Sequence, residues 1–174
     1  MLSAIRGDIE ADLSGVAARG WRRWLLVGAR IALSHRLQAV LLLRLSQMLG
    51  PRSSAAATVV KWLNQTLNGC DIAWQATILP GLRLDHPAGV VIGPAVRVGA
   101  SCTLMQGVTL GDNAGAPMLG DRVYVAPGAI VIGPVSIGDD AFVGANSVVT
   151  KSVPADSVVF GNPAEVRRRR SEAA

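Results

Sequence analysis

The sequence predicts a mainly β fold, a parallel β-helix preceded by an α-helical region. Between Ile72 and Pro154 an aliphatic residue returns at every sixth position, which fits neither the 3.6-residue period of a helix nor simple alternation. Six residues suit one short strand and the corner that follows it, with one side chain pointing inward. The inward positions are Ile72, Ile78, Leu84, Ile92, Val98, Leu104, Leu110, Leu119, Val125, Val131, Ile137, Val143 and Val149.

A second observation concerns the positions two places before the inward residues. Many of them hold small or β-branched residues, which suit a narrow prism: Val90, Val96, Cys102, Val108, Val123, Ala129, Val135, Ala141 and Ser147. A β-sandwich with short strands would not require a six-residue period over this length. We therefore expect a β-helix of roughly four coils, whose strands stack about 4.8 Å apart.

The six-residue register slips twice, and each slip marks a candidate for function. Eight residues separate Leu84 from Ile92, and nine separate Leu110 from Leu119. The first slip contains Asp85 and His86, and the second contains the glycine-containing loop 111–118. Loops on a regular scaffold carry function more often than the scaffold does.

Residues 1–70 predict an N-terminal helical region, followed by a β-helix domain over 71–160 and a basic tail over 161–174. We expect a short helix around Ile5 to Leu13, a second from Trp21 to Met48, and a third from Ser54 to Leu67. The apolar run within the second helix predicts burial, against another subunit in one interpretation. Arginines give the region a basic face, which favours solvated helices in an oligomer, with peripheral membrane contact as the alternative.

Composition narrows the classes of protein further. The chain has 174 residues, of which 50% are hydrophobic and 17% charged, as in a folded domain. Two cysteines make no disulfide framework, and early acidic residues argue against a signal peptide, so we expect a cytoplasmic protein. No apolar run is long enough to span a membrane. A net charge of +5 favours an anionic partner, for which we do not expect nucleic acid.

Few residues can carry chemistry. His86 stands at the first register slip and is the natural general base near neutral pH. Asp71, fifteen residues earlier and about one coil back, could orient its imidazole. His35 is expected mid-helix in a structural role, and Cys102 as a buried structural thiol. The sequence contains no P-loop, dinucleotide fingerprint or cysteine cluster.

Together with the period, several motifs resemble hexapeptide-repeat acyltransferases, and among these serine O-acetyltransferase and its relatives in polysaccharide gene clusters. The motifs are residues 71–72, 84–93, 106–111, 144–149 and 161–164, which read DI, LDHPAGVVIG, QGVTLG, GANSVV and GNPA. The resemblance implies a left-handed parallel β-helix, a homotrimer with active sites between subunits, and acetyl-CoA as co-substrate without a metal.

Carried over residue by residue, the resemblance implies roles for particular positions. His86 matches the family's general base, Asp71 its partner, and Asp85 an acidic residue near the acceptor amine. The positions expected to contact CoA are Gly111, Pro127, Ala145, Lys151 and Gly161. The arginine run Arg167 to Arg170 is a weaker candidate for the nucleotide phosphates.

Departures from the family pattern bear on the acceptor. Gly115-Ala116-Pro117 stands where serine acetyltransferases have Arg-His-Pro, so the cations that would hold a serine carboxylate are absent there. The helical region is also shorter, and Ala173-Ala174 replaces the isoleucine tail that docks to cysteine synthase. We therefore expect an O-acetyltransferase acting on a sugar or polysaccharide-precursor hydroxyl. The alternatives are a true serine O-acetyltransferase of cysteine biosynthesis and a non-catalytic scaffold, whereas a zinc hydratase would need a third histidine.

Overall fold

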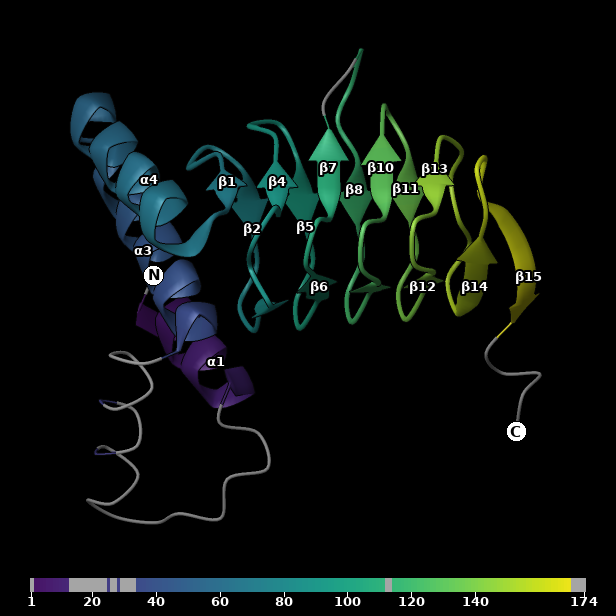
Figure 1. Cartoon of the computed structure of the whole chain (residues 1–174), viewed down its shortest axis with the longest axis horizontal. Coiled ribbons are helices and arrows are strands. Elements are labelled where there is room, and N and C mark those ends of the chain that lie inside the picture. The colour runs from purple at the N-terminus through teal and green to yellow at the C-terminus, as the bar shows by residue number, and fades with distance from the viewer. Residues whose placement is uncertain (1, 13–24, 26–27, 29–33, 112–113, 170–174) are drawn as a thin grey trace.

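A triangular solenoid of short strands forms most of the molecule, and helices cover its first coil (Figure 1). The computed structural model describes residues 2–12, 25, 28, 34–111 and 114–169. Three sheets form the sides, and strands that follow one another in the chain belong to different sheets, except for the last two. Each of the first ten strands pairs in parallel with the strand three places further along, so the hydrogen bonds run parallel to the solenoid axis.

The strands have the following bounds. The first side holds β1 (Asp71–Ile72), β4 (Val91–Ile92), β7 (Thr109–Gly111), β10 (Ile130–Ile132) and β13 (Val148–Val149). The second side holds β2 (Thr77–Ile78), β5 (Arg97–Val98), β8 (Met118–Leu119) and β11 (Ser136–Ile137). The third side holds β3 (Arg83–Asp85), β6 (Thr103–Met105), β9 (Tyr124–Val125), β12 (Phe142–Val143), β14 (Ser157–Phe160) and β15 (Glu165–Arg169).

The interior of the prism confirms the six-residue period. Every predicted inward aliphatic residue is buried, and so are the small residues two places before. Leu104, Leu110, Val125, Val131 and Val143 have no exposed surface at all. Because each side of a coil contributes one aliphatic and one smaller side chain, the core continues through the stacked coils without interruption.

The helical region consists, among the described residues, of α1 (Leu2–Asp12), α3 (His35–Leu49) and α4 (Ser54–Asn68). α4 agrees with its prediction: Ser53 caps its start by accepting from the Ala56 N–H, and Gly69 ends it in the left-handed conformation. The predicted helix from Trp21 to Met48 is wrong at Ser34, whose extended backbone precedes α3 as its N-cap residue. The prediction for most of 21–33 falls outside the described residues.

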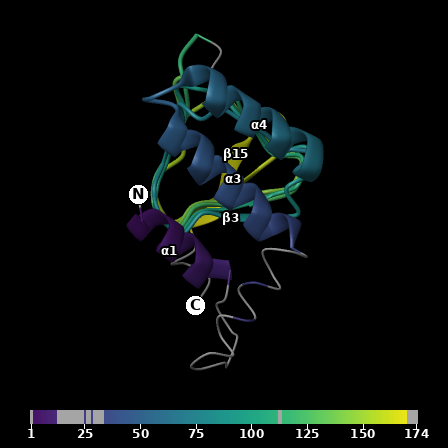
Figure 2. The same ribbon diagram turned by 90° about the vertical axis from the view of Figure 1, so that its left-hand side faces the viewer.

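α3 buries one face of its apolar run within this chain, and packing of its other face against another subunit stays a prediction. Leu37, Val40 and Leu43 pack within this chain, whereas Leu45 and Met48 are exposed. Figure 2 shows α3 and α4 lying across the end of the solenoid, viewed from the helical side. None of the helices in the described part of the chain has the length and hydrophobicity needed to cross a membrane.

Polar side chains join these helices to the open edge of the first coil. Arg44 of α3 donates to the carbonyls of Ile78 and Leu79, at 2.7 and 2.9 Å, and Gln47 donates to the carbonyl of Ala76 at 2.9 Å. β2 is an edge strand, so these carbonyls lie at the end of their sheet. The helical region thereby covers a strand edge that could otherwise pair with another chain.

A buried ion pair holds α1 in the same cap. The Asp8 carboxylate lies 2.7 Å from Nε of Arg44 and accepts hydrogen bonds from the N–H groups of Gly81 and Leu82, at 2.8 and 3.0 Å. Asp8 and Arg44 are each only 2% exposed. Two side chains thus tie α1, α3 and the first coil into one unit.

The far end of the solenoid is closed by a strand from the predicted basic tail. Glu165 to Arg169, which the sequence analysis placed in a basic tail, form β15 and pair antiparallel with β14. The reason is that β14 leaves an unpaired strand edge, and an antiparallel return needs only a short connection.

Candidate active site

His86 lies at an enlarged corner of the first coil. The step from Leu84 in β3 to Ile92 in β4 is two residues longer than the corresponding steps in later coils, and His86 occupies it with φ of 60°. That conformation is shared by other corner residues, such as Ser101 and Asn146, so it does not by itself distinguish His86. The His86 side chain is exposed, and no hydrogen bond or ion pair joins its imidazole to the described residues.

A cavity of about 510 Å³ lies beside this imidazole. Its walls come from the start of α3, the end of α4 and the corner after β3, and they comprise Ser34, His35, Arg36, Leu67, Asn68, Gly69, His86, Pro87 and Ala88. The volume is in the range of small-molecule sites. Both histidines of the chain therefore line one cavity.

His35 was not predicted to belong to a site, and its expected mid-helix position is wrong. It is the first residue of α3 and is exposed. Its Nδ1 lies 3.1 Å from Oδ1 of Asn68, whose amide nitrogen donates to Asn64 at 2.9 Å. This network assigns the ring proton to Nδ1 and leaves Nε2 as an acceptor in the neutral ring. Recognising Ser34 as an N-cap would have placed His35 at a helix start.

Asp85, which precedes His86, takes part in a cluster of charges. Its Oδ1 lies 2.6 Å from Nη2 of Arg36, and its Oδ2 lies 3.4 Å from Nη2 of Arg83. The carboxylate is largely buried, and two guanidinium groups face it. The predicted acceptor-binding residue therefore stands next to His86 and is linked to the wall of the cavity through Arg36.

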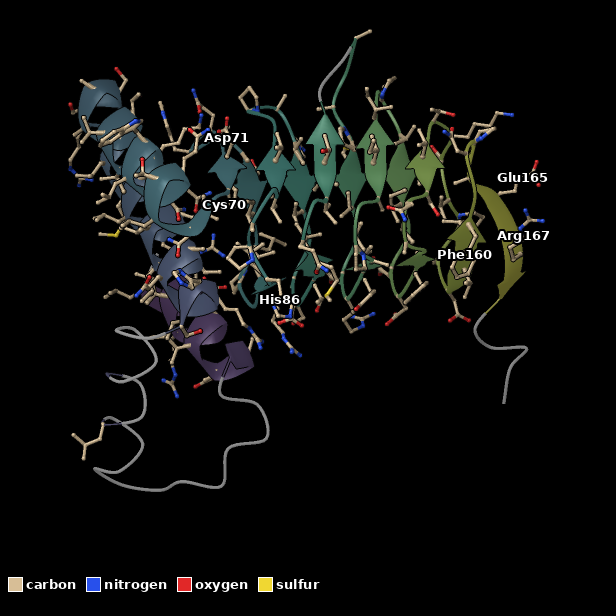
Figure 3. All side chains as sticks on the ribbon, in the orientation of Figure 1. Cys70, Asp71, His86, Phe160, Glu165 and Arg167 are labelled. Atoms are coloured by element: carbon tan, nitrogen blue, oxygen red, sulfur yellow. The ribbon has the colours of Figure 1, made fainter. Side chains whose placement is uncertain are left out.

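Asp71 is not joined to His86 in this structure. Its carboxylate pairs with Nζ of Lys61 at 2.5 Å, and no contact with the imidazole exists among the described residues. Figure 3 shows the two side chains apart, Asp71 beside α4 and His86 near the end of β3. The predicted orienting role would require Asp71 to leave Lys61.

Three of the five predicted CoA positions follow His86 along one corner of the solenoid. In register, Asp85 lies opposite Met105, Leu104 opposite Val125, Val125 opposite Val143, and Val143 opposite Val159. The corner residues that follow these strands are His86, Gln106, Pro127, Ala145 and Gly161. The Asn146 N–H donates to the Pro127 carbonyl at 2.9 Å, which confirms the stacking.

The other two predicted CoA positions lie at a different corner. Gly111 ends β7, opposite Ile132, and Lys151 follows β13 on the same side of the prism. The width of the first sheet separates them from the corner that carries His86. Gly115 and Ala116, in the loop that follows Gly111, carry no charge.

The two cysteines have no place in this site. Both are buried, and desolvation raises the pKa of each thiol to about 11. Neither forms a thiolate near neutral pH, which agrees with the structural role predicted for Cys102. Among the described residues, moreover, no group of histidine, cysteine or acidic side chains could hold a metal ion.

Comparison with known proteins defines the class first. Residues 116–151 match the family described as bacterial transferase hexapeptide (six repeats), and residues 89–115 match the hexapeptide repeat of succinyl-transferase. This is a hexapeptide-repeat acyltransferase with the left-handed parallel β-helix of that class.

Sequence and structural similarity over nearly the whole chain identifies the particular family. Serine acetyltransferase of Mycobacterium tuberculosis is 38% identical over 95% of this chain and 73% of its own length. The crystal structure of Neisseria gonorrhoeae serine acetyltransferase in complex with serine aligns with a TM-score of 0.82 at 26% identity, covering 95% of this chain and 68% of that one. The Brucella abortus enzyme in complex with coenzyme A gives 0.84 at 27% identity, covering 95% and 67%. The chain belongs to the serine acetyltransferase family of acetyl-CoA-dependent acyltransferases.

Proposed function

We propose that this protein transfers the acetyl group of acetyl-CoA to the hydroxyl of L-serine, with His86 as general base. The observation that carries the proposal is the exposed His86 imidazole, which has no partner among the described residues and faces a cavity of ligand size. The relatives reported above are all named for serine, which favours the serine alternative over the sugar acceptor that the sequence led us to prefer.

The proposed reaction is a direct attack in one transfer step. An imidazole nitrogen of His86 takes the proton of the acceptor hydroxyl as its oxygen attacks the thioester carbonyl carbon. The carbon–sulfur bond then breaks, and the CoA sulfur leaves with the proton from the imidazolium. Backbone N–H groups at the corners would stabilise the developing oxyanion.

The stacked corner supports a path for the donor. Because Gln106, Pro127, Ala145 and Gly161 follow His86 at successive coils, an extended pantetheine arm could run along this corner with its thioester toward the first coil. Gly111 and Lys151 lie elsewhere, so their predicted contacts would need the face of a neighbouring subunit in the proposed homotrimer. That trimer, acting in the cytoplasm, is part of the proposal.

A sugar hydroxyl remains the second candidate acceptor, because of one specific feature. Gly115-Ala116-Pro117 provides no cation where the resemblance expects one for a carboxylate. A buried carboxylate without a partner costs several kcal/mol, whereas a neutral hydroxyl compound avoids that penalty.

The test measures thiol release from acetyl-CoA with L-serine, homoserine and nucleotide sugars as acceptors. We expect His86→Ala to lower kcat by roughly 10²–10⁴-fold, the usual contribution of general-base catalysis, and to leave CoA affinity by calorimetry nearly unchanged. Gln75→Ala, at an exposed turn of the first coil, is the matched control. Wild-type turnover in His86→Ala would refute the assignment, and turnover with sugars alone would replace serine as the acceptor.

A further inference from the structure

The cavity beside His86 contains a cation that could take the place of the missing Arg-His pair. We infer that Arg36 binds the carboxylate of the acceptor, which restricts the acceptor class to small hydroxyl compounds that carry a carboxylate. The inference rests on the proposed function and adds to it the residue that decides specificity.

The first argument is the chemistry of the cavity wall. Among the described residues that line this cavity, Arg36 is the one permanently charged side chain; the others are apolar, amide, hydroxyl or imidazole groups and glycine. A guanidinium group can bind a carboxylate through two parallel hydrogen bonds, which a neutral wall cannot offer. Arg36 is also 35% exposed, so a ligand can reach it.

The second argument is the charge balance around Asp85. Arg36 and Arg83 both face this single carboxylate, at 2.6 and 3.4 Å. An acceptor carboxylate joining the cluster would meet both guanidinium groups. An acceptor ammonium group could in turn approach Asp85, so a zwitterion would find both partners next to His86.

The third argument is the position of Arg36 on its helix. It is the second residue of α3, and the Ser34 side chain makes no capping hydrogen bond to the first turn of that helix. The start of a helix carries the positive end of the helix dipole, which has the same sign as the guanidinium charge, so both favour an anion in the cavity. The loop around Gly115 supplies neither effect.

The experiment compares L-serine with L-serinamide, which keeps the hydroxyl and the amino group but lacks the carboxylate. We expect Arg36→Gln to raise KM for L-serine roughly 10- to 150-fold, the usual range for hydrogen bonds to a charged group. KM for L-serinamide and for acetyl-CoA should stay within about twofold of wild type, and Arg36→Lys should fall between, because it keeps the charge and loses the fork. Arg52→Gln, an exposed arginine after α3, is the matched control.

Three outcomes would overturn the inference. An equal rise in KM for L-serine and for L-serinamide in Arg36→Gln would mean that Arg36 acts only on folding or on Asp85. An unchanged KM for L-serine would place the carboxylate elsewhere while leaving the proposed function intact. A wild-type protein that turns over sugars and neither serine compound would overturn the serine acceptor and this inference together.

Discussion

Removing either member of the buried ion pair between Asp8 and Arg44 should destabilise the protein more than removing an exposed charged side chain. Arg44→Met leaves Oδ2 of Asp8 without its 2.7 Å partner and also removes the donors to the carbonyls of Ile78 and Leu79. Breaking a buried ion pair costs about 3–5 kcal/mol, and we expect Arg44→Met at the upper end because two carbonyls lose their donors as well.

Asp8→Asn should lower the free energy of unfolding by less, about 3 kcal/mol, because Arg44 keeps both carbonyls and Gln47 as partners. The assay is urea denaturation at matched protein concentration, because oligomerisation shifts apparent stability. The double variant should lose less than the sum of the single losses, as expected for residues in contact.

The control is Arg6→Met, which removes an exposed ion pair to Glu10 on the same helix and should leave the free energy of unfolding unchanged. A loss below about 1 kcal/mol in Arg44→Met would refute the reasoning that this pair holds the cap. Additive single losses would show that the two residues act independently.

Two further predictions concern the thiols and the assembly. Burial raises the pKa of Cys70 and of Cys102 from 9.0 to about 11, so the folded protein retains two protons that the unfolded chain loses above about pH 9. The stabilisation from the two protonated thiols should therefore be fully present below pH 9, and the free energy of unfolding should fall between pH 9 and 11 by roughly 1.4 kcal/mol per pH unit for each thiol. Urea denaturation across this pH range should show a shallower fall for the Cys70→Ala/Cys102→Ala variant. The same dependence on pH in the variant and the wild type would contradict the argument. For the assembly, sedimentation equilibrium should give three times the chain mass of 18.1 kDa, and a stable, active monomer would rule out the homotrimer.

The arrangement of strands in the solenoid could be predicted from the sequence because the same short pattern of residues recurs in every coil. A six-residue period constrains which side chains point inward at every coil, so errors at one position are corrected by its neighbours. The two register slips were visible for the same reason, and the first of them located His86 and Asp85. Helix ends were predicted less well: α4 ends at Asn68, one residue beyond the predicted Leu67, whereas Ser34 interrupts a helix that the apolar pattern alone had joined.

The partners of polar side chains were decided by the tertiary structure. Asp8 meets Arg44 across 36 residues of chain, and Asp71 pairs with Lys61, not with His86. His35 and Arg36 reach the cavity of His86 because α3 packs across the first coil, at a sequence separation that no periodicity encodes. Hydrophobic residues need only an inward position, which a repeat supplies, but an ionic or hydrogen-bonded group needs a particular partner at about 3 Å, and only the folded chain determines which one it meets.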